Sequence, residues 1–163
     1  MPVDNSAGFF VGDNMEIWTD ASFDQKRKVA GWGVVIKEGM KERTYSNWLP
    51  TDNVNLAEIF AIHTACVLAG GKQCSIYSDS MTAISYINGT IREDKPRTRE
   101  QWINHKKMKF WAYKIRKFNA NIEWTKGHKR TFQIDAIGNS MADLKARSGL
   151  SKFYLTLDRK RVR

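Results

Sequence analysis

Three segments with the pattern of β-strands follow one another before any helical pattern begins, which restricts the folds open to this chain. The segments are residues 15–20, 31–37 and 42–48, and Gly39 marks the turn between the last two. The third alternates apolar and polar residues, as strands with one buried face do. Three consecutive strands predict an antiparallel meander.

The rest of the chain alternates predicted helices with predicted strands. Apolar residues fall at helical spacing from Leu56, and two glycines at 70 and 71 end that helix. Asn139 is a plausible N-cap of the last helix. The remaining elements are a strand at 74–78, helices at 80–88 and about 100–118, and a strand at about 121–125. Strands separated by helices predict parallel additions, so we expect an α/β fold with a mixed five-stranded sheet flanked by helices.

Length and composition favour one globular domain. The chain has 163 residues, 42% of them hydrophobic, which is enough to bury a core. We expect a flexible lead-in at 1–14, the domain at 15–150 and a basic tail at 151–163. No apolar run reaches membrane-spanning length, and the start lacks the pattern of a secretory signal. Two cysteines make no disulfide framework, so we expect reduced thiols in a cytoplasmic monomer.

The net charge of +10 is unevenly distributed along the chain. Residues 92–130 hold thirteen Lys or Arg against four Asp or Glu, and residues 147–163 hold six against one. The remaining residues are net acidic. A solubilising surface would explain the excess of basic residues, but a basic band beside acidic groups is better suited to holding a polyanion against metal ions.

Four acidic residues are assigned to four different predicted elements. Asp20 and Asp79 follow strand-like runs, whereas Glu58 and Asp143 lie near predicted helix starts. Each alone reads as a cap or a turn residue. Four close carboxylates would repel one another, and hard divalent cations such as Mg²⁺ offset that charge. We therefore predict that the four acids bind metal.

Four motifs, in order, closely resemble those of the type 1 ribonuclease H family. They are TDAS at 19–22, NLAEIFAI at 55–62, YSDSMTAI at 77–84, and WTKGH at 124–128 followed by GNSMAD at 138–143. The resemblance covers about residues 15–150. It implies a ribonuclease H fold and endonucleolytic hydrolysis of the RNA strand of RNA–DNA hybrids, leaving 5′-phosphate and 3′-hydroxyl ends.

The resemblance also assigns roles to individual residues. It implies that Asp20, Glu58, Asp79 and Asp143 hold two Mg²⁺ ions, with Mn²⁺ as a substitute. It makes His128 the histidine of a loop, where an imidazole serves proton transfer or product release. We expect structural roles for the other two histidines, His63 and His105.

Substrate contacts are expected around the acids and on a basic helix face. Candidates near the acids are Ser22, Phe23, Asn55 and Asn139, and candidates on the face are Lys106, Lys109, Arg116 and Lys117. Trp102 is a further candidate, with core packing as its alternative, and the other tryptophans read mostly as core residues.

The chain departs from the family pattern at several points. Ala21 replaces a common glycine, and Val54 replaces an asparagine that usually reads the minor groove. The loop after His128 looks long. The usual basic handle is not recognisable, and no N-terminal hybrid-binding module is seen. Two alternatives stay open: a nuclease of the same fold with another nucleic acid substrate, and a module that binds nucleic acid without catalysis.

Overall fold

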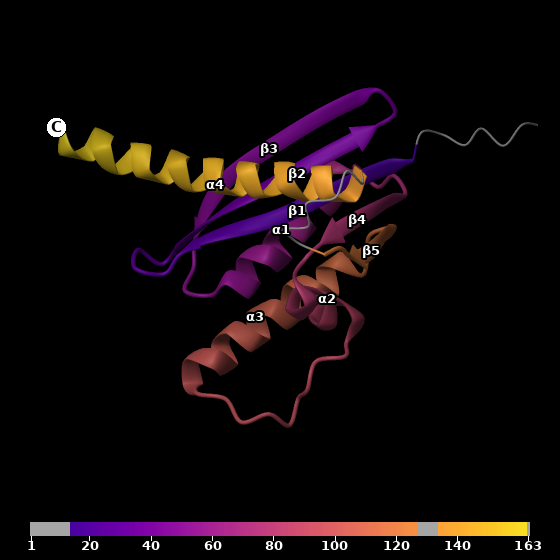
Figure 1. Ribbon diagram of the computed structural model, residues 1–163. Helices are drawn as coiled ribbons and strands as arrows, with labels where there is room; N and C mark the ends of the chain where they lie inside the picture. The colour runs from indigo at the N-terminus through magenta and orange to yellow at the C-terminus, as the bar shows by residue number, and fades with distance from the viewer. Residues whose placement is uncertain (1–13, 127–133, 163) are drawn as a thin grey trace, which may run out of the picture.

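The computed structural model describes residues 14–126 and 134–162, and within them the protein forms five strands and four helices (Figure 1). The strands are β1 (Met15–Asp24), β2 (Val29–Glu38), β3 (Lys41–Pro50), β4 (Cys74–Ser78) and β5 (Ala120–Trp124). The helices are α1 (Val54–Leu68), α2 (Met81–Asn88), α3 (Arg99–Ile115) and α4 (Ile134–Arg161). Every element predicted from the sequence is present in the predicted order.

The strands form one mixed sheet in the order β3-β2-β1-β4-β5. Strands β1, β2 and β3 pair antiparallel, while β4 is parallel to both β1 and β5. The predicted meander with two parallel additions is confirmed. Strand β1 is longer than predicted, because its pairing with β2 continues to Asp24 after its pairing with β4 has ended at Thr19.

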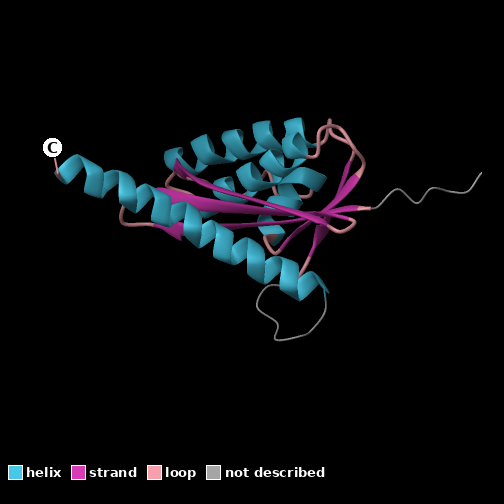
Figure 2. Ribbon diagram, turned by 90° about the horizontal axis from the view of Figure 1, so that it is seen from above, coloured by secondary structure: helices cyan, strands magenta, loops and turns pink. Residues whose placement is uncertain are grey.

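Helices cover both faces of the sheet (Figure 2). Alternate residues of the central strands belong to opposite layers. Ile17 and Val34 belong to the larger core under α1 and α3. Their neighbours Trp18 and Val35 are fully buried on the other face, against Ala142 of α4. Side chains alternate along a strand, so one short sequence serves both layers.

Helix α4 lies directly on β2 because two glycines leave room for its backbone. A Cβ at Gly31 would collide with the backbone of α4 near Ala146, and one at Gly33 would collide near Ala142. Gly138 fills a similar role inside the helix, where a Cβ would strike the ring of Trp18. These close approaches fix the position of α4 relative to β1.

Helix α4 corrects two expectations. It begins at Ile134, so Asn139 lies within the helix and the predicted N-cap is wrong. The Gly138-Asn139 pair resembles a helix start, but the glycine is explained by its packing on Trp18. The helix also continues to Arg161, so most of the expected tail is helical and the expected boundary at 150 lies inside the helix.

Long-range contacts attach this C-terminal extension to the sheet. The ring of Phe153 meets Trp48 edge-on, with centroids 5.0 Å apart, and the Tyr154 hydroxyl donates to Asp24 Oδ2 at 2.8 Å. The Lys152 ammonium donates to the Ser46 carbonyl at 2.6 Å. In the described part of the chain, no helix combines the length and apolarity needed to cross a membrane.

Candidate active site

Three of the four predicted acids meet where β1 and β4 separate. Asp20 lies one residue past the last β1–β4 pair, Asp79 follows the end of β4, and Glu58 projects from the second turn of α1. One carboxylate oxygen from each residue lies within 4.8 Å of the other two. We call Asp20, Glu58 and Asp79 the carboxylate cluster.

The backbone around Asp79 is fixed from two sides. Ser80 caps α2 by accepting from the Ala83 N–H. On the other side, the Trp124 indole donates to the Asp79 carbonyl at 3.3 Å, and the Thr125 N–H donates to the Ser78 carbonyl at 2.9 Å. The end of β5 therefore sets where Asp79 leaves the sheet. Trp124 was expected in the core but is half exposed.

Asp143 approaches the cluster from α4, on the other face of the sheet. It lies close enough to Asp20 for its negative charge to contribute to the raised pKa of that carboxyl. It also forms an ion pair with Arg147 one turn later, in which Nε lies 3.4 Å from Oδ1. Sequence motifs did not single out Arg147. Its i, i+4 spacing from Asp143 is the signal that would have revealed it.

Burial and mutual repulsion favour the protonated, neutral form of the carboxyl groups in the cluster. Burial, followed by the neighbouring Asp79 and Asp143 carboxylates, raises the pKa of Asp20 to about 7. The Ala21 N–H, which donates to Asp20 Oδ1 at 2.9 Å, opposes this rise. Burial, followed by Asp20 and Asp79, also raises the pKa of Glu58 well above its usual value.

The residues fit a divalent cation. Glu58 is 6% exposed, and its Oε2 has no hydrogen-bond partner within the described residues. A buried oxygen of this kind is rare unless something else satisfies it. Mg²⁺ and similar ions prefer carboxylate oxygens, and a bound cation reverses the effect of the crowded negative charges. The geometry therefore suits metal-assisted chemistry on a polyanion.

Comparison with known proteins agrees with this geometry. The RNase H family model matches residues 12–151. The chain belongs to the RNase H family. It is 26% identical over 150 residues to a ribonuclease H of Bordetella avium, covering 85% of this chain and 92% of that protein. Members of the family depend on divalent metals, which accords with the carboxylate cluster.

Solved structures share the RNase H fold. RNase H1 of the archaeon Halobacterium salinarum matches with a TM-score of 0.64 at 16% identity, covering 85% of this chain and 98% of that chain. A foamy viral protease-reverse transcriptase in complex with an RNA/DNA hybrid matches with a TM-score of 0.59 at 20% identity. That match covers 85% of this chain and 20% of the viral chain.

Other predicted residues of this RNase H family member lie at varied distances from the cluster. His128 lies outside the described residues. Ser22 and Phe23 follow Asp20 on β1, and Asn55 is partly buried in the first turn of α1. Asn139 is 3% exposed, one turn before Asp143, and its Oδ1 has no hydrogen-bond partner within the described residues.

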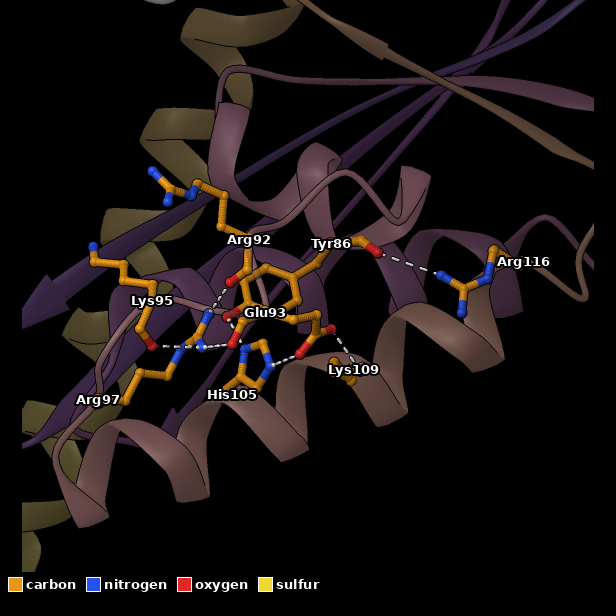
Figure 3. Close-up of polar contacts among 8 residues, drawn as sticks. All are labelled: Tyr86, Arg92, Glu93, Lys95, Arg97, His105, Lys109 and Arg116. Atoms are coloured by element: carbon orange, nitrogen blue, oxygen red, sulfur yellow. Dashed lines mark hydrogen bonds and ion pairs between the residues drawn. The ribbon is translucent and has the colours of Figure 1, made fainter.

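The predicted basic face is divided by the structure. The Lys109 ammonium donates to Glu93 Oε1 at 2.6 Å, and Arg116 donates to the carbonyls of Tyr86 and Ile87 at 3.3 and 3.0 Å (Figure 3). Both cations point toward α2 and its following loop. Lys106 and Lys117 are exposed. The four side chains therefore do not form one continuous surface.

His63, His105 and Trp102 have structural partners. His105 is 1% exposed, with Nδ1 2.7 Å from the Tyr86 hydroxyl and Nε2 2.9 Å from Glu93 Oε2, as the expected structural role requires. His63 packs edge-on against Trp111 with centroids 4.7 Å apart. Trp102 is 41% exposed and carries the Arg97 guanidinium 5.1 Å above its ring.

Proposed function

We propose that this protein hydrolyses the RNA strand of RNA–DNA hybrids at the carboxylate cluster, with two divalent metal ions. The observation that supports this most directly is the meeting of Asp20, Glu58 and Asp79 within 4.8 Å. The buried Oε2 of Glu58 has no hydrogen-bond partner among the residues that the structure describes. The family match and the ribonuclease H relative support the reaction class. A foamy viral neighbour in complex with an RNA/DNA hybrid supports the substrate.

The side chains divide the work of holding and positioning. Asp20 and Glu58 would hold metal from the buried side, Asp79 from the end of β4 and Asp143 from α4. Divalent ions held by these residues would supply activation of the attacking water and stabilisation of the leaving 3′ oxygen, chemistry that would yield 5′-phosphate and 3′-hydroxyl ends. Arg147 holds Asp143 and supplies a positive charge beside the cluster. We propose that His128 transfers a proton or assists product release.

Hybrid selectivity would come from contacts beside the cluster. Asn55 and the backbone near Ser22 and Phe23 are proposed to read the hybrid, with 2′-hydroxyl contacts on the RNA strand and shape recognition of the DNA strand. Asn139 brings an amide with an unpartnered oxygen one turn from Asp143. A 2′-hydroxyl donates and accepts hydrogen bonds, so it distinguishes RNA from DNA at such a position.

We further propose Mg²⁺ as the physiological ion, with Mn²⁺ as a substitute, and a monomer working in the cytoplasm. The oxygen-only donor set of the cluster suits either ion. The two free cysteines, Cys66 and Cys74, are both buried, in keeping with a reducing compartment. Burial, followed by the neighbouring Cys74, raises the pKa of Cys66 to about 12 and keeps that thiol protonated.

A direct assay tests the proposal. End-labelled RNA–DNA hybrid, duplex DNA and duplex RNA of one sequence are incubated with the protein in Mg²⁺, in Mn²⁺ and in EDTA. We expect cleavage of the RNA strand of the hybrid alone, and none in EDTA. Comparable cleavage of duplex DNA would indicate a different nuclease of this fold. No cleavage of any substrate, with binding retained, would indicate a binding module.

A further inference from the structure

The outward face of α3 carries large apolar side chains that are exposed within the described part of the chain. Ile103 is 46% exposed, Phe110 is 53% exposed and Tyr113 is 54% exposed. Successive residues of an α-helix are 100° apart, so these three fall within a sector of about 80°. The inner side of the same helix is buried, with Met108 and Ala112 in the core beneath it. The exposed apolar residues are therefore a surface feature and not part of the fold's interior.

Four lysines share this face. Lys106, Lys107 and Lys114 are exposed within α3, and Lys117 is exposed in the turn that follows. With the three apolar residues they occupy a sector of about 120°. Glu100, in the first turn, is the one acid of α3. We call the three apolar residues and the four lysines together the outer face of α3.

The lysines and the rings are already in contact. The Lys114 ammonium lies 4.8 Å from the centroid of the Phe110 ring, and the Lys117 ammonium lies 4.3 Å from that of Tyr113. An ammonium group held over a ring places a positive charge next to that ring, where it attracts anions. Two further cations, Lys109 and Arg116, bond instead to loop 89–98 and to α2 (Figure 3).

Aromatic rings spaced among lysines match the chemistry of an unpaired nucleic acid strand. Phe110 and Tyr113 are one turn apart, so their Cβ atoms are neighbours at about 5–6 Å. Bases of a single strand are free to stack on such rings while lysines neutralise the phosphates. A duplex keeps its bases stacked inside and offers a phosphate surface, which would use the lysines but leave the rings without partners.

We propose that the outer face of α3 binds single-stranded nucleic acid. The site is distinct from the carboxylate cluster, because its residues lie on the exposed side of α3 and none of them belongs to the cluster. Helix α3 also covers the sheet face opposite α4 (Figure 2). Bases stack on Phe110 and Tyr113, and Lys106, Lys107, Lys114 and Lys117 contact phosphates. This site goes beyond the proposed cleavage, because it takes an unpaired strand and needs no metal.

Fluorescence anisotropy with a labelled twelve-nucleotide oligo(dT), in EDTA, tests the site. Ribonuclease H chemistry does not consume this probe. Replacing Phe110 and Tyr113 together by Ala should weaken binding at least tenfold, because loss of base–aromatic stacking costs about tenfold or more per base. The matched control replaces two exposed apolar residues outside α3, Met40 and Val67, by Ala and should change affinity less than twofold.

Two further variants separate stacking from simple apolar contact and from charge. Phe110→Tyr with Tyr113→Phe keeps both rings and should bind as wild type, whereas Phe110→Leu with Tyr113→Leu keeps apolar area and should lose most of the affinity. Changing the four lysines to Gln should make the plot of log affinity against log salt shallower by roughly 1.4 if two of them touch phosphates.

The remaining outcomes overturn the proposal. Equal affinity for the leucine variant would mean that stacking is absent. A face built for another partner would show itself if vesicles of anionic phospholipid, poly-glutamate or duplex DNA bound as tightly as oligo(dT) and lost affinity in the same alanine variant. Cleavage of a blunt hybrid is measured in parallel and should be unchanged in the alanine variant, so failure here leaves the proposed function standing.

Discussion

The carboxylate cluster and the junction between α2 and α3 both gather charged side chains, yet their charges are arranged in opposite ways. In the cluster, like charges are buried together, and the pKa of Asp20 rises to about 7. At the junction, hydrogen bonds from Lys109 and then His105 lower the pKa of Glu93 to about 2. One region is incomplete without a ligand, whereas the other is satisfied by the protein itself.

The junction fastens loop 89–98 to α3 (Figure 3). Arg97 donates to the carbonyls of Glu93 and Lys95, both at 3.1 Å, and to that of Arg92 at 2.5 Å. Glu93 is half exposed, so solvent weakens its ion pairs. The comparison teaches that charge density alone does not identify a functional site. What distinguishes the cluster is that its acids are buried together, so that burial and the neighbouring carboxylates raise the pKa values of Asp20 and Glu58.

The largest expected effect comes from removing one charge of the cluster. Asp79→Asn keeps the size of the side chain but removes a proposed metal ligand, so cleavage of hybrid in Mg²⁺ should fall to less than a tenth of wild type. Affinity for hybrid should hold or rise, since negative charge facing phosphate is reduced. Asp158→Asn, an exposed change on α4, is the matched control and should leave cleavage intact.

A variant that retains more than a tenth of wild-type turnover would remove Asp79 from the metal site. A variant that fails to fold would instead show a lower melting temperature by circular dichroism. Turnover and melting temperature together distinguish loss of a metal ligand from loss of folded structure. Turnover above a tenth of wild type would reduce the contrast between the carboxylate cluster and the junction.

A smaller effect is expected on stability without metal. Because the folded pKa of Asp20 exceeds its unfolded value, the folded state binds more protons between about pH 4 and 7. The stabilisation is present below about pH 4 and is lost as the pH rises through about 7. Its full size is on the order of 4 kcal/mol, of which roughly 3 kcal/mol is lost between pH 5 and pH 8, so in EDTA the Asp20 contribution should lower the melting temperature by about 5 °C or more over that range.

Added Mg²⁺ should offset that loss, and its stabilising effect should be larger at pH 8 than at pH 5. Asp20→Asn removes the titrating group, so its metal-free melting temperature should vary less over this range. Differential scanning fluorimetry measures all of these values. If the change in wild-type melting temperature between EDTA and Mg²⁺ were the same at pH 5 and pH 8, the buried acids would not destabilise the metal-free protein.

The fold was largely predictable because its signals are local. Alternation in 42–48 and helical spacing from Leu56 need no knowledge of distant residues. The extension of α4 was not predictable, because contacts from Phe153 to Trp48 and from Tyr154 to Asp24 attach residues far apart in sequence. Gly138 misled for the same reason, since only the Trp18 ring explains it.

The site was predictable to the extent that motifs carry it. Asp20, Glu58 and Asp79 each occur in a motif near an element boundary, and the structure brings these three predicted acids together. Helical spacing placed Lys109 and Arg116 on the basic face but did not predict their hydrogen bonds. Their partners lie on α2 and on loop 89–98, and the sequence does not reveal the course of that loop. Periodicity shows which side of a helix a residue occupies, but it does not show what a long side chain reaches.

The smallest expected effect tests whether the junction is purely structural. Arg116 Nη1 donates to the carbonyls of Tyr86 and Ile87 in the last turn of α2, where a cation also complements the helix dipole. Arg116→Ala should lower the free energy of unfolding by about 1 kcal/mol, which corresponds to a melting temperature about 2–4 °C lower. Lys117→Ala, one residue later and exposed, should change stability by less than about 0.5 kcal/mol.

Urea unfolding followed by circular dichroism measures both variants, and hybrid cleavage is assayed beside it. Arg116→Ala should cleave at close to the wild-type rate at saturating hybrid, because this side chain is bonded to α2 and not to the cluster. A variant with wild-type stability but weaker hybrid binding would show that Arg116 leaves its carbonyl partners to contact substrate. The junction would then share the property that distinguishes the cluster, a charge held ready for a ligand.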